Sequence, residues 1–292
     1  MNESRSQRAA RRAGEFPPAP EPLAVPVFDS HTHLDITVHE AGVPGGGATD
    51  PVEALLTAAA KAGIDRVVQV GVDLASSRWS ADLAARHPAV LATVALHPNE
   101  APRLPDLDEQ LRQIEALAAQ PRVRGVGETG LDSFRTGDDG RAAQELSFRA
   151  HIAIAKRHGK ALIIHDRDAH RRVLEILDEE GAPDTVILHC FSGDAAFAAD
   201  CARRGYLLSF AGTLTFASAG ALRAAAAVPP VDQVLVETDA PYLTPAPYRG
   251  RPNASYLIPL TVHALAAARG SDLDELCAAI SATGERALGP WR

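Results

Sequence analysis

The stretch that organises this chain is Val27-Phe28-Asp29-Ser30-His31-Thr32-His33-Leu34-Asp35. The apolar run at residues 25–28 predicts a short buried strand that ends on His31 and His33. Residues two apart on extended backbone point to the same side, so both imidazoles would stand together at the carboxyl end of the strand. Neutral histidine nitrogens suit a divalent cation such as zinc or manganese. For this motif alone, the alternative of two polar residues closing a strand stays open.

Composition limits the classes of protein to consider. A chain of 292 residues can hold one large α/β barrel or two ordinary domains. The net charge of -8 repels polyanions, which argues against non-specific duplex binding through a basic face, although bound metal ions could attract phosphate locally. The 3 cysteines form no Cys-x-x-Cys pair, and this favours a reducing, cytoplasmic compartment. No apolar run is long enough to cross a bilayer.

The first 24 residues differ from the rest. Several arginines are followed by closely spaced prolines. The pair Arg11-Arg12 could suggest a twin-arginine export signal, but prolines stand where its apolar segment would have to be. We therefore predict a disordered N-terminal tail over 1–24, followed by one domain over 25–292.

After the tail, short apolar segments alternate with helical patterns. The segments suit parallel strands that are buried on both faces. The first long helical pattern has Asp50 as its N-cap, Glu53 to complete a capping box, and Gly63 as its stop. Further helices are expected after the Asp106 cap, at 141–158, 167–180, 193–204 and 217–227, and twice after 255. The expected strands are 25–28, 66–70, 90–96, 123–127, 161–164, 185–188, 206–210 and 233–236.

Eight strand-helix units in one chain of this length predict an α/β fold, a closed (β/α)8 TIM barrel. The alternative is an open, doubly wound sheet. The glycine-rich segment at 42–47 is expected to form a mobile loop above the first strand.

Active sites of such barrels lie at the carboxyl ends of the strands. In this chain, metal-binding residue types follow six of the expected strands, and 11 histidines scattered by chance would rarely do so. The metal ligands that we predict are His31, His33, Glu128, His165, His189 and Asp239. For His97 a metal-site role and a structural role are equally supported. The other histidines fall in loops or helices and are expected to be solvated: His39, His87, His151, His158, His170 and His263.

Six ligands are too many for one tetrahedral ion and suit two cations that share a bridge. A carboxylated lysine cannot be that bridge, since Lys61 and Lys156 fall on helices and Lys160 enters a strand at its amino end. Glu128 is the natural bridge, because each carboxylate oxygen can serve one cation.

Six motifs in order resemble the TatD family of metal-dependent hydrolases over nearly everything after the tail. They are the histidine motif at 29–35, Leu96-His97-Pro98, Gly127-Glu128-Thr129-Gly130-Leu131-Asp132, Ile164-His165-Asp166-Arg167-Asp168-Ala169, His189-Cys190-Phe191-Ser192-Gly193 and Glu237-Thr238-Asp239-Ala240-Pro241-Tyr242-Leu243. The resemblance implies a metal-dependent barrel that hydrolyses phosphodiesters, with deoxyribonuclease activity, often 3′ to 5′ exonuclease. It also implies a first cation on His31, His33, Glu128 and Asp239, and a second on Glu128, His165 and His189.

The ligands suggest the chemistry. Two cations would acidify a shared water, so that hydroxide is available near neutral pH, and would hold the phosphodiester oxygens. We expect Asp239 to act as the base, with His97 and Arg167 binding the phosphate. An ion pair with Asp168 or a neighbouring acid is at least as good a role for Arg167. Cys190 should point into packing and carries no expected chemistry, and Glu237 is a candidate partner for a histidine.

The identity of the substrate is less defined. Ser133 stands where the family usually has an aromatic residue, before Phe134, and Ala254 and Ser255 replace an acidic residue and a proline after Asn253. Three functions stay open: a two-metal nuclease acting on DNA ends, a hydrolase of a small ester, lactone or amide, and a non-catalytic binding protein. The acidic charge favours short single-stranded ends over long duplex. The ligands favour zinc, manganese, cobalt or nickel, with magnesium possible at an exchangeable site.

Overall fold

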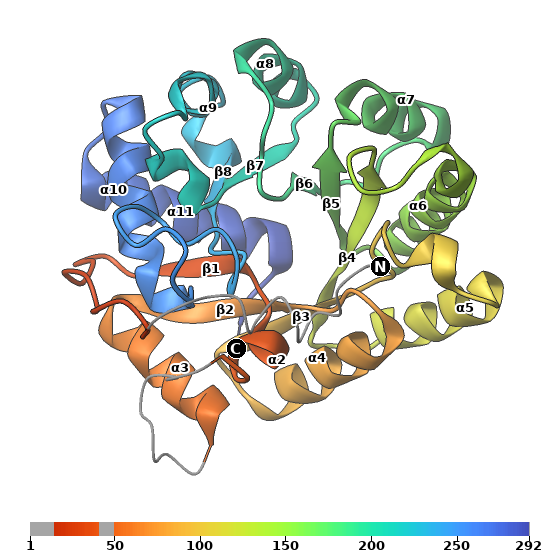
Figure 1. Cartoon of the computed structure of the whole chain (residues 1–292), viewed down its shortest axis with the longest axis horizontal. Helices are drawn as coiled ribbons and strands as arrows, with labels where there is room; N and C mark the ends of the chain where they lie inside the picture. Colours follow the sequence, from red (N-terminus) through yellow and green to blue (C-terminus); the bar gives the residue numbers. More distant parts are fainter. Residues whose placement is uncertain (1–14, 41–49, 292) are drawn as a thin grey trace.

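The computed structural model describes residues 15–40 and 50–291, and within them eight strands form one parallel sheet. The strands pair in chain order from β1 to β8, whereas the strand order of a doubly wound sheet reverses. Helices surround the strands on the outside (Figure 1). The predicted (β/α)8 barrel is therefore confirmed. The strands are β1 Val27–Thr32, β2 Ile64–Val70, β3 Val90–Val94, β4 Val123–Asp132, β5 Ala161–Arg167, β6 Val186–Leu188, β7 Leu207–Phe210 and β8 Val234–Val236.

The helices follow the strands in alternation. Asp50 caps α3 as predicted, accepting hydrogen bonds from the backbone N–H groups of Val52 and Glu53. The Glu53 carboxylate pairs with His87 at 3.0 Å, the contact that the structure gives it in place of the expected capping box. The α-helices are α2 Leu34–Thr37, α3 Pro51–Lys61, α4 Leu74–Arg86, α5 Leu107–Ala118, α6 Asp138–His158, α7 His170–Glu180, α8 Ala195–Arg203, α9 Gly220–Ala226, α10 Ile258–Arg269 and α11 Leu273–Leu288. Short 3-10 helices lie at Ala101–Arg103, Gly212–Thr215, Val231–Gln233 and Ser255–Leu257.

Helix α4 has no counterpart among the predicted helices. Its N-terminus is a capping box in which Asp73 accepts from the backbone of Ser76, while the Ser76 hydroxyl accepts from the backbone of Asp73. Serine in the place of the usual glutamate or glutamine hides this signal in the sequence.

Several strands run further than the apolar pattern indicates. β1 continues to Thr32, four residues past the expected end, and β4 and β5 continue to Asp132 and Arg167. The apolar run stops where side chains begin to meet at the end of the barrel, but the backbone ladder goes on, with Gly130 beside His165 and Asp132 beside Arg167. The strands therefore carry polar residues directly into this end of the barrel.

The first and last strands meet along a seam. The carboxylate of Asp29 on β1 accepts hydrogen bonds from the backbone N–H of Thr238 at 2.9 Å and from its hydroxyl at 2.5 Å. A single bridge joins Thr32 to Ala240. Asp29 is completely buried, and burial raises its pKa to about 7 in spite of the hydrogen bonds it accepts. Side chain and backbone together thus close the barrel.

The tail prediction is wrong for residues 15–24. Phe16 and Leu23 are 8% and 6% exposed and belong to the core cluster. The segment is also held by hydrogen bonds from Arg251 to the Phe16 carbonyl and from Tyr256 to the Pro17 carbonyl. Two well-spaced apolar side chains among the prolines are enough to attach it to the barrel wall. Residues 1–14 and the glycine-rich loop at 42–47 lie outside the described residues.

In the part of the chain that the structure describes, none of the helices combines the length and the apolar character needed to span a bilayer.

Candidate metal centre

The predicted site residues all lie at the carboxyl end of the barrel. His31 is in β1 and His33 follows it directly. Glu128 and His165 lie within β4 and β5, because these strands are longer than predicted. The remaining side chains come from the loops just after strands, with His189 after β6, His97 after β3 and Asp239 after β8. Segments up to about 200 residues apart in the sequence thus meet at one end, as parallel barrel strands require.

Glu128 stands at the centre of the cluster, and its two oxygens face different histidines. Oε2 lies 3.4 Å from His31 Nε2 and 3.8 Å from His33 Nε2. Oε1 lies 2.7 Å from His165 Nδ1, 2.9 Å from His189 Nε2 and 3.3 Å from His97 Nε2. One carboxylate therefore faces two sets of nitrogen donors, one set on each oxygen.

Asp239 faces the first of these sets. Its Oδ1 lies 3.4 Å from His33 Nε2 and 3.8 Å from His31 Nε2. Its backbone N–H donates to the carbonyl of His31 at 2.9 Å, across the seam between β8 and β1. Asn253 supports this loop by donating to the carbonyls of Thr238 and Tyr242. The segment that carries Asp239 is therefore fixed on both sides.

The donor set fits divalent cations. His31 is completely buried, and neither of its ring nitrogens has a hydrogen-bond partner among the described residues. A buried polar atom without a partner is costly, so such an atom calls for an explanation. Ligands about 2.1 Å from one tetrahedral ion lie about 3.4 Å from each other. The distance of 3.4 Å between His31 Nε2 and Glu128 Oε2 matches that spacing.

The site contains three overlapping groups of three residues, and within each group the potential ligand atoms lie within 4.8 Å of one another. They are His31 with His33 and Glu128, His31 with His189 and Asp239, and His97 with Glu128 and His165. His97, for which two roles were open, thus stands with the potential ligands.

The charges of the cluster also suit cations. Burial works to raise the pKa of Glu128, but the charges of His189 and His97 and hydrogen bonds from the histidines hold it well below its usual range. Burial and the nearby charge of His189 lower the pKa of His31. Although burial works to lower them, the pKa values of His33, His165 and His189 are raised by the carboxylates around them, so protons would compete with cations for these three histidines.

Two carboxylates outside the predicted ligand set orient the histidines. Glu237 is completely buried and its Oε1 lies 3.2 Å from His189 Nδ1, which confirms the expectation that it partners a histidine. Asp132 was missed as a site residue. Its Oδ2 lies 3.3 Å from His165 Nε2 and accepts from Asn99 at 2.8 Å. Carboxylates that bond a histidine in this way fix its ring and raise its basicity.

Asp132 also organises the turn that follows it. Its Oδ1 accepts from the backbone N–H groups of Phe134 and Arg135 at 3.0 and 2.8 Å. This turn projects Phe134 outward, 64% exposed, with the Arg167 guanidinium 4.1 Å from the centre of its ring. Among the described residues Arg167 forms no ion pair with Asp168 or with another acid, which was its alternative role. An aromatic residue two positions after the motif aspartate is the sequence signal that could have identified Phe134 as a candidate site residue.

One further expectation is wrong. His151 is not solvated but completely buried: its Nε2 accepts from the backbone N–H of Leu96 and its Nδ1 lies 3.1 Å from the Thr129 hydroxyl. The surroundings of Cys190 agree with the expectation that it carries no chemistry. Its N–H donates to Glu237, and burial together with the charges of nearby carboxylates raises the pKa of its thiol well above the usual value. The thiol therefore stays protonated and is no nucleophile.

The sequence pattern of this site extends over nearly the whole chain. The family model described as TatD related DNase matches residues 28–289. The chain belongs to the TatD family. An uncharacterized metal-dependent hydrolase TatD of Mycobacterium tuberculosis is 47% identical over 267 residues, covering 90% of this chain and 98% of that protein.

Other TatD proteins extend the comparison. The protein named 3′-5′ ssDNA/RNA exonuclease TatD of Citrobacter rodentium is 34% identical over 236 residues, which is 78% of this chain and 88% of its own length. Among solved structures, a TatD homologue from Escherichia coli superposes with a TM-score of 0.81 at 26% identity, covering 90% of this chain and 98% of that one. The TatD chain described here is thus a member of a family of metal-dependent hydrolases, with the barrel of its relatives.

Proposed function

We propose that this protein is a phosphodiesterase that uses two divalent cations to remove nucleotides from the 3′ ends of single-stranded nucleic acid, DNA first of all. The observation that carries the proposal is the position of Glu128, because each of its two carboxylate oxygens faces a different set of histidines. In this proposal His31, His33, Glu128 and Asp239 hold one cation, and Glu128, His165 and His189 hold the other. Such a pair suits a substrate whose attacking and leaving groups are both oxygens.

The residues of the cluster divide the work. Cations bound there would acidify water and neutralise charge on the phosphoryl oxygens. Asp239 is the base in this proposal, because its side chain is 15% exposed whereas that of His31 is completely buried. Asp239 can thus meet solvent and take a proton from the attacking water. His97, at 14% exposure, and Arg167 lie toward the open side and would bind the phosphate.

Phosphodiesterase activity on single strands is supported by two independent facts. A relative that is about one third identical carries the name of an ssDNA/RNA exonuclease. The chain has a net charge of -8, and an acidic protein gains little from long duplexes with many phosphates.

The cytoplasm is the proposed compartment, because Cys190, Cys201 and Cys277 are all unpaired in the structure.

The test uses the purified full chain, stripped with a chelator and reloaded separately with zinc, manganese or magnesium. End-labelled DNA and RNA of one sequence, single-stranded and duplex, are the substrates. We expect release of nucleotides from the 3′ end of single strands, abolished by the chelator and restored by a cation. Asp239→Asn keeps the shape of the side chain but loses the base, so kcat should fall by about 10²- to 10⁴-fold.

The matched control is Asp65→Asn, the same chemical change at an exposed position where β2 begins, at the other end of the barrel. It should retain the activity of the unaltered protein. Hydrolysis of a small ester, lactone or amide without any cleavage of nucleic acid would contradict the proposal, as would full activity of Asp239→Asn.

A further inference from the structure

A cavity of about 640 Å³ lies at the end of the barrel opposite the metal centre. Its walls are formed by the first residues of β4 and β5, by the residues just before β6, and by the last turns of α6 and α11. Its charged or titratable lining residues are Arg124, Lys156, His158, Lys160, Asp184 and Arg286. The volume falls in the range of sites that bind small molecules, but the lining is far more charged than that of an apolar pocket.

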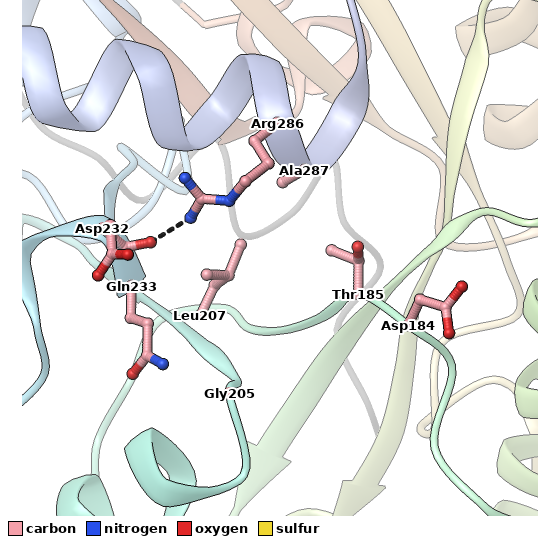
Figure 2. A pocket seen from close by; sticks show the side chains of 8 residues that line it. All are labelled: Asp184, Thr185, Gly205, Leu207, Asp232, Gln233, Arg286 and Ala287. Carbon is pink, nitrogen blue, oxygen red and sulfur yellow. Dashed lines mark hydrogen bonds between the residues drawn. The ribbon is translucent and has the colours of Figure 1, made fainter.

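A second hollow of about 240 Å³ adjoins it and shares four lining residues with it: Asp184, Thr185, Arg286 and Ala287. Figure 2 shows this part, with Arg286 reaching from α11 toward Asp232 and with Leu207 and Gln233 below, at the starts of β7 and β8. The two hollows together form one groove across the amino ends of five strands.

The cations of the groove have no carboxylate partners among the described residues. Lys160 donates to the carbonyl of Val123 at 2.7 Å, and Lys156 donates to the carbonyl of Glu180 at 2.8 Å. Arg286 donates to the backbone carbonyl of Asp232. Carbonyl oxygens satisfy the hydrogen bonds of these groups but do not cancel their charge.

Arg124 is the least satisfied of the four. Its Nε is buried and has no hydrogen-bond partner within residues 15–40 and 50–291. A Cβ built on Gly289 would lie 3.3 Å from Arg124 Nη1, so the absence of a side chain at this position leaves room for the guanidinium. Burial, and then the charge of Arg124, lower the pKa of Lys160, which shows that the two cations repel each other.

Several cations elsewhere on this acidic chain have carboxylate partners, whereas others, such as Arg122 and Arg223, bond only backbone carbonyls. Arg66 meets Glu285 at 2.8 Å, Arg172 meets Glu145 at 2.7 Å, and Arg204 pairs with Asp178. In the groove, two carboxylates, Asp184 and Asp232, line the wall beside four cations, and neither forms an ion pair with them among the described residues. The groove therefore concentrates positive charge on a protein whose net charge is negative.

We propose that this groove is an anion-binding site, separate from the metal centre, for a small molecule that carries a phosphate group. A phosphate would offer acceptor oxygens to Arg124 and Arg286, whose planar donors match it, and a compact charge to Lys156 and Lys160. Inorganic phosphate, pyrophosphate and nucleoside 5′-phosphates share this chemistry. The site does not depend on the nuclease activity proposed above.

The test is calorimetric titration of the full chain with phosphate, pyrophosphate and thymidine 5′-monophosphate at constant ionic strength. A chelator is present throughout, so that bound cations cannot attract the anion. We expect saturable binding to one site. Arg124→Gln combined with Lys160→Gln should weaken it at least about tenfold, or roughly 1.4 kcal/mol. Because these residues are partly buried, Lys156→Glu serves as a second variant at an exposed position, with the same expected direction.

The control is Lys61→Glu, an exposed lysine of α3 that lines neither hollow, and it should bind as the unaltered chain does. Tighter binding of the nucleotide than of phosphate would show that the groove also holds the nucleoside, whereas equal affinities would show a site for the inorganic ion. The proposal is wrong if no anion binds saturably, if Lys61→Glu weakens binding as much as Lys156→Glu, or if binding is lost in His165→Ala but kept in Lys156→Glu.

Discussion

Two carboxylates outside the predicted ligand set contact histidines of the candidate metal centre. Glu237 contacts Nδ1 of His189, and Asp132 contacts Nε2 of His165. Both carboxylates are completely buried. A carboxylate in such a place fixes the direction of an imidazole, which would otherwise turn about its side-chain bonds. Substitutions at these two positions would therefore disturb the centre without removing any of its predicted ligands.

Phe134 is a residue whose exposure calls for a function. Its ring is 64% exposed beside the site and lies against Arg167. Aromatic rings stack on bases, at about 1–3 kcal/mol per base. We expect Phe134→Ala to raise the KM for single-stranded DNA by about 5- to 100-fold, with kcat on a small phosphodiester without bases unchanged.

The control for Phe134 is Leu146→Ala, which removes an exposed apolar side chain from α6 and should leave the KM unchanged. Equal KM values for Phe134→Ala and the unaltered protein would show that the ring binds no base.

The ligand types were readable from the sequence because histidines and carboxylates recur where strands end. Their partners were not readable. The pairing of His165 with Asp132 depends on β4 and β5 lying in a register that places Asp132 beside Arg167. The sequence alone gives no such register once the apolar pattern has stopped. His151 lies on α6 and was assigned to solvent because its buried partners, the Leu96 backbone and Thr129, are distant in sequence.

At the scale of the elements, β4 and β5 pack closely against each other next to the site. A Cβ built on Gly127 would lie 2.5 Å from both Cβ and the carbonyl oxygen of Ile163, and one on Gly130 would lie 2.2 Å from the carbonyl oxygen of His165. Real Cβ contacts are never so short. Glycine at these positions lets β4 bring Glu128 to the middle of the cluster.

Gly127→Ala should therefore destabilise the fold by about 2 kcal/mol or more, because the backbone of β5 cannot give way as a side chain can. The measurement is chemical denaturation, with the free energy of unfolding compared at equal denaturant dependence. Gly220→Ala is the control, since an added Cβ at the start of α9 meets nothing within 4 Å. It should be neutral or slightly stabilising. Equal stability of both variants would show that β4 and β5 can separate at little cost.

Element types were predicted better than element ends. Caps such as Asp50 and Asp106 act locally and are visible in sequence. The start of α4 is local too, but its serine-based box differs from the usual pattern. The ends of β1 and β5 are decided by partners on neighbouring strands, so no local pattern could have shown them.

The architecture of the whole molecule follows from the count and order of its strands, which the alternating apolar segments gave correctly. The attachment of residues 15–24 did not follow from that pattern. It rests on Phe16 and Leu23, two side chains in a segment whose prolines indicate an extended chain and nothing about where it lies. Contacts of that kind appear only when the surface that receives them is known.

Global stability should depend on pH through His151. Burial lowers its pKa to about 4, from the ordinary value of 6.5. Between these values the unfolded chain binds a proton that the folded chain does not, so its contribution is complete above pH 6.5 and is lost as the pH falls toward 4. The loss amounts to about 3 kcal/mol. We expect unfolding free energies, measured with chelator present, to fall less steeply over this range in His151→Gln.

His263→Gln is the control, because His263 is exposed on α10. Its pH profile should run parallel to that of the unaltered protein. A His151→Gln profile that also runs parallel would show that His151 does not contribute to the pH dependence of stability.

The seam between β1 and β8 gives the centre a second role. His31 and His33 belong to the opening strand of the barrel and Asp239 to the loop that leaves its closing strand, with the Asp239 amide already bonded to the His31 carbonyl. An ion bound by these three side chains would link the first strand of the barrel to the loop after the last strand. Metal binding should then stabilise the contact between β1 and β8 that closes the barrel, and removal of the metal should weaken the barrel along this contact.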